Sequence, residues 1–354
     1  IPDILVQADD RSGYFVYAGD GSNATTALKK FVINTDFTDV NLVRSVQPAI
    51  ANIVGTSAPE VIAVNRAGYV FIFDRTGGTE SYYMYKSTTP TQYTSEVSPY
   101  VVDIDGDGKA EIVLGNDVFG IVNGALVKRV AGIPISLPTA NHLNGIDSVV
   151  IDIIPSNPGK EIVYASRVYG VNLVTGTMTV LKDLSLISGS GVASGDIGPT
   201  AVADMDLDGD LDIVYHGNAE VIIWDPNQSS LLFKRTYVGT GGTRGLPLVA
   251  NVFNDKITGG KTIDFPEAVI VNGGIVTAYN LNYTTGNQRV WTLTVPDPSG
   301  MTGLTAFDFD GNGIREIVYR DQNNLRIING NLATPVDLVV TPVTSATWSE
   351  YPIV

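Results

Sequence analysis

The sequence predicts an all-β fold, a seven-bladed β-propeller of four-stranded antiparallel blades. Three observations support it: an acid followed by apolar residues recurs about every 50 residues, short strand-like segments fill each interval, and the chain ends supply parts of one more repeat. The acids are Glu60, Glu111, Glu161, Asp212, Glu267 and Glu316, and successive acids are 51, 50, 51, 55 and 49 residues apart.

Each repeat is predicted to contain four strands. In one repeat the expected strands are Thr200–Met205, Leu211–His216, Glu220–Trp224 and Ser230–Tyr237. In the first complete repeat they are Ala49–Ile53, Glu60–Asn65, Tyr69–Phe73 and Ser81–Lys86. Apolar residues alternate in the outer strands and are continuous in the inner ones, as expected when sheets pack face to face.

The two ends of the chain look like parts of a single blade. Residues 2–5, Pro-Asp-Ile-Leu, repeat the acid and apolar run but lack a preceding first strand, and residues 351–354, Tyr-Pro-Ile-Val, resemble the start of one. We therefore predict one domain, 1–354, closed by pairing of the N- and C-terminal strands. The alternative is a simple boundary of the fragment. The predicted blades cover 48–98, 99–147, 148–198, 199–246, 247–303, 304–350, and 351–354 joined with 1–47.

Composition excludes several classes of protein. With 354 residues, 44% of them hydrophobic, the chain can bury a large core. It has no cysteine, which excludes disulfides, thiol chemistry and zinc–thiolate sites. A net charge of −15 argues against nucleic-acid binding. No apolar run approaches the roughly 18 residues of a membrane helix, and we expect any signal peptide to have been removed.

Three loops combine acidic residues and glycine in a pattern that predicts calcium binding. Ca²⁺ takes about six to eight oxygen ligands, and a short acidic turn can supply most of them. The predicted ligands of the first loop are Asp103, Asp105, Asp107, Glu111 and the Lys109 carbonyl; of the second, Asp204, Asp206, Asp208, Asp212 and the Asp210 carbonyl; of the third, Asp308, Asp310, Asn312, Glu316 and the Ile314 carbonyl.

The loops differ from an EF-hand. Their closing acid is the ninth residue rather than the twelfth, and β-branched residues follow it, which places the loop inside a β-hairpin. Mg²⁺ suits such loops less well because it prefers strict octahedral geometry with several waters. The alternative is a solvated Asp-Gly turn without metal. Within the metal hypothesis we expect a structural role, because coordination uses all the acids.

These residues resemble the FG-GAP/VCBS-type repeat, the calcium-loop blade of integrin α-subunit propellers and of many bacterial surface proteins. The shared pattern is D-x-D-x-[DN]-G-x-x-[DE], present three times at blade spacing. The Phe-Gly and Gly-Ala-Pro signatures of the integrin version are missing except for Phe119-Gly120. The resemblance implies a propeller with structural calcium and implies no integrin function.

The other three interior loops depart from the pattern. Residues 52–60 have no carboxylate before the last position, residues 152–161 delay the acid by one residue, and residues 251–267 carry an insertion, 256–262. We predict that these loops bind no Ca²⁺. Loops with and without the metal pattern thus alternate along the chain, which suggests duplication of a two-blade unit.

The sequence predicts no catalytic centre. The two histidines, His142 and His216, fall in different blades and neither is beside a plausible nucleophile. Loop acids that chelate a metal cannot provide the protonated carboxyl of a glycosidase pair. The alternatives are a polysaccharide-active, lyase-like enzyme, a lectin, or a structural spacer. The enzyme alternative needs basic and aromatic residues converging on the axial face, for which only Arg235, Arg244 and Trp291 are candidates.

Aromatic residues concentrate in the connections between blades, on the face opposite the calcium loops. They are Tyr82, Tyr83, Tyr85, Tyr93, Trp291 and Trp348. They either pack between blades or form a platform for a glycan or protein partner. We expect a calcium-stabilised, non-enzymatic module of a secreted or cell-surface protein, used in adhesion, ligand binding or surface assembly. We also expect it to belong to a larger multidomain chain, without nucleic-acid binding or membrane insertion.

Overall fold

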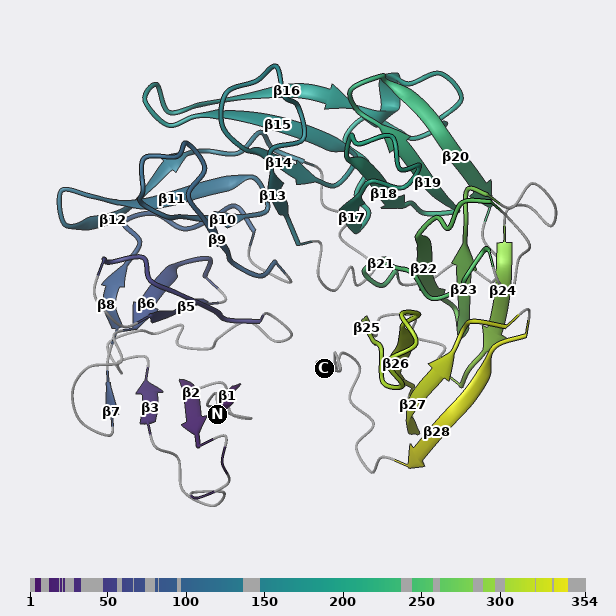
Figure 1. Cartoon of the computed structure of the whole chain (residues 1–354). Helices are drawn as coiled ribbons and strands as arrows, with labels where there is room; N and C mark the ends of the chain where they lie inside the picture. Colours follow the sequence, from purple (N-terminus) through teal and green to yellow (C-terminus); the bar gives the residue numbers. More distant parts are fainter. Residues whose placement is uncertain are drawn as a thin grey trace. The chain divides into compact units, whose positions relative to one another are not determined.

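The structure, a computed structural model, confirms an all-β protein. It describes residues 4–7, 13–18, 20, 22, 29–32, 47–55, 59–65, 67–73, 80–81, 83–93, 97–135, 147–236, 244–256, 262–282, 289–296, 303–321, 323–332 and 334–342. Within these residues the regular structure consists of strands and one short 3-10 helix, η1 (Leu184–Leu186) (Figure 1). The chain forms two compact units. The first comprises Ile1–Pro134, Asn157–Ile162 and Tyr169–Thr179; the second comprises Ile135–Ser156, Val163–Val168 and Val180–Val354.

The first unit contains two four-stranded antiparallel sheets. One has the order β4-β5-β6-β8, with bounds Ala49–Ala51, Glu60–Val64, Val70–Phe73 and Tyr83–Lys86. The other has the order β9-β10-β11-β12, with bounds Tyr100–Val102, Glu111–Leu114, Asp117–Val122 and Ala125–Val130. Asn123 and Gly124 join β11 to β12 with positive φ angles of 51° and 77°, as a tight two-residue hairpin requires.

A third sheet of the first unit lies at the N-terminus and is mixed. Its order is β1-β2-β3-β7, with bounds Ile4–Gln7, Gly13–Tyr17, Lys29–Val32 and Glu80–Ser81. The first three strands are antiparallel, and β7 pairs parallel with β3. The predicted strand Ser81–Lys86 is therefore wrong as a single element. Its partner β6 ends at Phe73, opposite Tyr83, so the residues before Tyr83 pair with β3 instead.

Four further sheets complete the described structure. One sheet has the order β13-β14-β15-β16, with bounds Val149–Ile151, Glu161–Tyr164, Arg167–Asn172 and Thr177–Asp183. The second unit contains the sheets β17-β18-β19-β20, β21-β22-β23-β24 and β25-β26-β27-β28. Their bounds are Thr200–Ala203, Asp212–His216, Glu220–Asp225 and Ser230–Thr236; Leu248–Ala250, Glu267–Asn272, Ile275–Tyr279 and Arg289–Thr294; and Leu304–Phe307, Glu316–Arg320, Asn324–Asn329 and Val336–Pro342.

The second strands of several sheets are buried on both faces. Every residue of β5, β10 and β18 is buried, whereas most residues of the outer strand β20 are only partly buried. In the second unit, one core cluster joins Val214 and Phe233 of one sheet to Ala268 and Tyr279 of the next. Sheets packed face to face bury apolar residues from both partners, which explains the continuous apolar runs of the inner strands.

Six of the sheets are four-stranded and antiparallel, as expected for propeller blades. The predicted strands between residues 200 and 237 agree with β17–β20 to within two residues at each described end. The predicted closing strand, 351–354, lies outside the described residues. Closure and a seventh blade therefore stay predictions. In the described part of the chain, no helix has the length and apolar character needed to cross a membrane.

Candidate metal centres in three acidic loops

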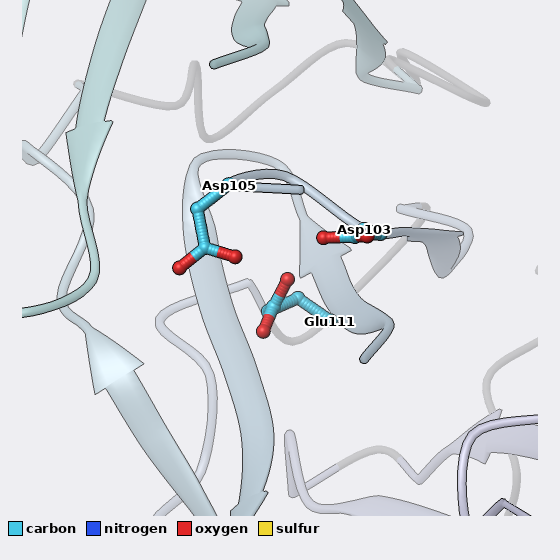
Figure 2. Close-up of side chains that lie close together, drawn as sticks. All are labelled: Asp103, Asp105 and Glu111. Carbon is cyan, nitrogen blue, oxygen red and sulfur yellow. The ribbon is translucent and has the colours of Figure 1, made fainter. Parts of the chain in front are cut away.

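Three acidic loops each bring carboxylate oxygens together. The first loop, residues 103–111, connects β9 to β10, and Figure 2 shows the carboxylates of Asp103, Asp105 and Glu111 turned towards one another. Their oxygen atoms lie within 4.8 Å of one another. The same spacing recurs in loops 204–212 and 308–316, where the groups are Asp204, Asp206 and Asp212, and Asp308, Asp310 and Glu316.

The first acid of each loop organises the turn. Asp103 Oδ1 accepts hydrogen bonds from the Gly106 N–H (2.8 Å) and the Asp107 N–H (3.1 Å), and Asp103 Oδ2 accepts one from the Gly108 N–H (2.9 Å). In the other two loops Asp204 and Asp308 accept from the residues four and five positions later. Such short side-chain-to-backbone bonds fix an acidic turn in one conformation.

The remaining predicted ligands lie in the same turns but outside the grouped carboxylates. In each loop one of these side chains accepts a hydrogen bond from the N–H two residues later, at 2.7–2.9 Å. The accepting residues are Asp107, Asp208 and Asn312. These donors belong to Lys109, Asp210 and Ile314, the residues predicted to ligate through their carbonyls. The structure thus assembles three of the predicted side-chain ligands in each loop and keeps the others close by in sequence.

The closing acid of each loop is buried and ties the two ends of the loop together. Glu111, Asp212 and Glu316 are each 1% exposed. Glu111 Oε2 accepts from the Ile104 N–H (3.2 Å), Asp212 Oδ2 from the Met205 N–H (2.8 Å), and Glu316 Oε2 from the Phe309 N–H (2.9 Å). Each donor is seven residues before its acid, so the three loops close in the same way.

Burial and crowding of negative charge raise the pKa values of two of the closing acids, Asp212 and Glu111. Burial, reinforced by the charges of Asp206 and neighbouring acids, raises the pKa of Asp212 to about 7. Burial likewise raises the pKa of Glu111, although Arg129 donates to Glu111 Oε1 at 2.5 Å and partly offsets this effect. A bound cation would relieve this electrostatic cost, since it favours the charged form of every acid in the loop.

The donor set fits a hard cation. All the grouped atoms are carboxylate oxygens, the ligand type that Ca²⁺ prefers, and flexible acidic turns tolerate its irregular coordination. The chain has no cysteine, and neither histidine falls in these loops, so the ligands that favour zinc are missing there. The three loops could therefore hold metal ions, with Ca²⁺ the best chemical match.

The closing acid has a second role that sequence analysis missed. In loops 52–60 and 251–267, which lack the metal pattern, Glu60 accepts from the Ile53 and Val54 N–H groups, and Glu267 accepts from the Val252 and Phe253 N–H groups. The acid therefore closes loops that have no grouped carboxylates in the described structure. The sequence contains a signal for this second role. The closing acid occurs in all six repeats, whereas a metal ligand is needed only in the three loops with the metal pattern.

A side-chain amide lies between the acids of loop 251–267. Asn280 Nδ2, at the end of β23, donates to Glu267 Oε1 at 2.5 Å and to Asp255 Oδ2 at 2.9 Å. Both acids are fully buried. In loop 152–161, Asn157 Nδ2 donates to Glu161 Oε1 in a similar way, at 2.6 Å. Neutral protein donors thus contact the closing acid in two of the loops that lack the metal pattern.

Most of the aromatic side chains that were predicted to form a platform, and that the structure describes, pack against other side chains of the protein. Tyr93 and Trp291 are 3% exposed, and Tyr83 contacts Phe71 edge to face, with ring centroids 5.2 Å apart. Tyr82, Trp348 and His142 lie outside the described residues. Arg235 stacks over Phe233 within its own sheet rather than beside Trp291. For the described side chains, these contacts favour packing over a ligand platform.

Comparisons with known proteins show the fold alone. No protein-family model and no curated protein sequence matches the chain. Among solved structures, the chain resembles the V. cholerae biofilm matrix protein Bap1, with a TM-score of 0.62 at 13% identity, over 98% of this chain and 77% of that one. It also resembles BamB from Moraxella catarrhalis, with a TM-score of 0.56 at 13% identity, over 99% and 92%. The rhamnogalacturonan lyase YesW gives 0.55 at 12% identity, over 98% of this chain and 60% of the lyase. The fold is therefore propeller-like.

Proposed function

We propose that the chain is a calcium-stabilised, propeller-like module of a secreted or cell-surface protein, mediating adhesion, ligand binding or surface assembly without catalysis. The observation that carries the proposal is the threefold recurrence of the same oxygen cluster at the same place in a sheet. Each cluster lies in the short loop between the first and second strands, where an ion would brace a hairpin. The finer assignment to the FG-GAP/VCBS-type repeat rests on this recurrence together with the sequence pattern.

Several observations support a structural rather than a catalytic role. The acids of each loop accept backbone hydrogen bonds that hold the turn, and the closing acid is buried beneath it. His216 is fully buried and burial lowers its pKa to about 4, so its ring is neutral at physiological pH and closed to solvent. Trp291 belongs to the core between sheets, which removes one of the residues that a lyase-like site would need.

The proposed calcium sites support an exterior location. Ca²⁺ sites built from several carboxylates suit the calcium-rich exterior, and the similar structure Bap1 is named a biofilm matrix protein. In this proposal the acidic loops stiffen one end of the sheets. A glycan or protein ligand binds on the opposite face, and the module is part of a larger multidomain chain.

Thermal melting with and without calcium tests the structural proposal. Three sites at a hundredfold excess of Ca²⁺ over Kd would add about 8 kcal/mol in total, which corresponds to a Tm rise of roughly 10 °C for a chain of this length. An equal Tm in EDTA and in Ca²⁺ would refute structural calcium. A glycan array and a polysaccharide-cleavage screen test the binding role, and release of an unsaturated product would overturn the non-enzyme proposal.

A further inference from the structure

The first and second acidic loops differ in the charge around their closing acids. Loop 103–111 contains four acids and one lysine, and Arg129 donates to its closing acid, Glu111, from outside the loop. Loop 204–212 contains five acids and no basic residue. Because the affinity of a calcium loop depends on the charge of its ligands, the two centres are not equivalent.

A β-bulge sets the direction of the Arg129 side chain. The register of β11 and β12 shifts between Val118 and Phe119, so that Arg129 is the extra residue on β12. The extra residue of a bulge has no partner across the sheet, and the bulge turns its side chain out of the regular alternation of the strand. Arg129 can therefore cross β11 towards β10.

Gly120 leaves the path of that side chain open. Continuing the register of β10 and β11 by one residue places Gly120 opposite Glu111. A Cβ atom at Gly120 would lie 2.7 Å from Arg129 Cδ, so the arginine passes directly over the glycine. It donates to Glu111 Oε1 at 2.5 Å, while the Ile104 N–H donates to Oε2 at 3.2 Å. Both oxygens of Glu111 thus accept hydrogen bonds from the protein, and one of the donors is a cation.

The second centre has an acid in place of this cation. The pairing of β19 with β20 has an equivalent bulge, whose extra residue is Leu232. Continuing the register of β18 and β19 by one residue places Asp225 opposite the closing acid, Asp212. Opposed residues project to the same side, with Cβ atoms about 4.5–5.5 Å apart. Asp225 is buried, and its Oδ1 accepts from the Asn227 N–H (2.7 Å) and the Gln228 N–H (3.1 Å), which fixes its carboxylate beside the centre.

Two further sheets support this comparison. Asn280 is opposite the closing acid Glu267 and donates to it at 2.5 Å, so a side chain at this position reaches the closing acid. In the sheet of the third acidic loop both positions are neutral, and the residues are Asn329 and Leu338. The two positions thus contribute a cation to the first centre, an anion to the second and no charge to the third.

We propose that these two positions grade the calcium affinity of the acidic loops, so that loop 204–212 fills before loop 103–111 as the calcium concentration rises. In the first centre Arg129 repels the entering cation and competes with it for Glu111. In the second centre Asp225 adds attraction without occupying a ligand position. The first loop belongs to the first unit and the second loop to the second unit, so the second unit is braced at the lower calcium concentration.

This inference rests on the structural-calcium proposal above. Amide hydrogen exchange of the wild-type chain during a calcium titration tests it, because peptides from the two loops report each centre separately. The titration is run at about pH 8, where protons compete little with Ca²⁺ for carboxylates. Loop 204–212 is expected to become protected at about a tenfold lower calcium concentration than loop 103–111.

The two proposals fail in distinguishable ways. Equal midpoints, or earlier protection of loop 103–111, would overturn the grading and leave structural calcium standing. Protection of neither loop, together with a Tm that is the same in EDTA and in Ca²⁺, would overturn both proposals.

Arg129→Met tests the role of the cation. The midpoint of loop 103–111 should fall by about tenfold, and that of loop 204–212 should not change. In EDTA the variant should have a lower Tm than wild type, because buried Glu111 loses its counter-ion, and Ca²⁺ should restore most of the difference. An unchanged midpoint would refute the role of Arg129. If the variant fails to fold, the two wild-type midpoints still decide the proposal.

Lys128→Met is the matched control. Lys128 is the neighbouring residue on β12, and it forms a similar ion pair with a buried acid outside the loop, Asp117, at 3.0 Å. This variant should lose the same Tm in EDTA and in Ca²⁺ and keep both midpoints. An equal shift of the first midpoint in both variants would show that the arginine has no specific effect on the centre.

Asp225→Asn tests the second centre. The amide keeps an oxygen acceptor for the Asn227 and Gln228 N–H groups and removes the charge. The midpoint of loop 204–212 should rise by about tenfold, while that of loop 103–111 stays constant. An unchanged second midpoint would refute the contribution of Asp225.

Discussion

At the residue scale, the fourth position of each acidic loop requires a left-handed backbone. Its φ is 77° at Gly106, 61° at Leu207 and 73° at Gly311. Glycine adopts this conformation freely, whereas a side chain with a Cβ atom is strained there. Leu207 is half exposed, so packing does not compensate it fully. The loop 204–212 therefore contains local strain that the other two loops avoid.

We expect Leu207→Gly to raise the free energy of unfolding by about 0.5–1 kcal/mol, since relief of the strain exceeds the entropy cost of glycine. The converse change, Gly106→Ala, should lower it by about 1 kcal/mol, because the added Cβ meets nothing within 4 Å and only the backbone conformation matters. Urea denaturation in saturating Ca²⁺ measures both. Changes of the same sign in the two variants would contradict the strain argument.

Glu267 gives the stability of the chain a dependence on pH. Burial raises its pKa to about 8, above the ordinary value of 4.5. Between these values the folded chain keeps a proton that the unfolded chain releases. The free energy of unfolding therefore falls as pH rises through this window, by up to about 1.4 kcal/mol per pH unit.

Glu267→Gln removes this titration and keeps an oxygen acceptor for the Val252 and Phe253 N–H groups. We expect the variant to gain stability relative to wild type as pH rises from 5 to 8, measured by urea denaturation in saturating Ca²⁺. Glu220→Gln, on β19, controls for the loss of one negative charge. Parallel pH profiles for wild type and Glu267→Gln would show that the buried carboxyl does not titrate in this range.

At the scale of the element, each acidic loop is expected to bind one ion independently. Asp105→Asn should weaken calcium binding in its loop by about tenfold or more, because a charged ligand is lost. At limiting Ca²⁺ the number of bound ions should therefore fall by one per chain. In EDTA the same change should leave the Tm unchanged or raise it, since repulsion between carboxylates is reduced. Metal analysis after dialysis at limiting Ca²⁺ gives the count. Asp152→Asn, in a loop without grouped carboxylates, is the control and should leave the count unaltered.

The repeat spacing and acid pattern predicted the elements well where they depend on local sequence. The strands of the repeat 199–246 and the carboxylate groups of three loops follow from periodicity and spacing, and both agree with the structure. Pairings between distant segments could not be predicted in this way. The parallel pairing of Glu80–Ser81 with β3, and the bridge between Arg244 and Asn272, leave no trace in local periodicity.

At the scale of the whole molecule, the calcium response should be confined to the three acidic loops. A variant carrying Asp105→Asn, Asp206→Asn and Asp310→Asn is expected to melt at the same temperature in EDTA and in Ca²⁺. The loops 52–60, 152–161 and 251–267 supply no second source of stabilisation in this prediction. A remaining rise in Tm with Ca²⁺ would show that at least one of those loops also binds an ion.

Loop 152–161, which lacks the metal pattern, is hydrogen-bonded to the first acidic loop, 103–111. Lys160 donates through Nζ to the Asp103 carbonyl oxygen at 2.7 Å and through its backbone N–H to the Ile104 carbonyl oxygen at 2.9 Å. These bonds hold the start of one loop against the strand entry of the next repeat. Under a pulling force, such a joint makes two neighbouring hairpins share the load. An ion in loop 103–111 would then raise the force needed to detach a hairpin that binds no metal itself.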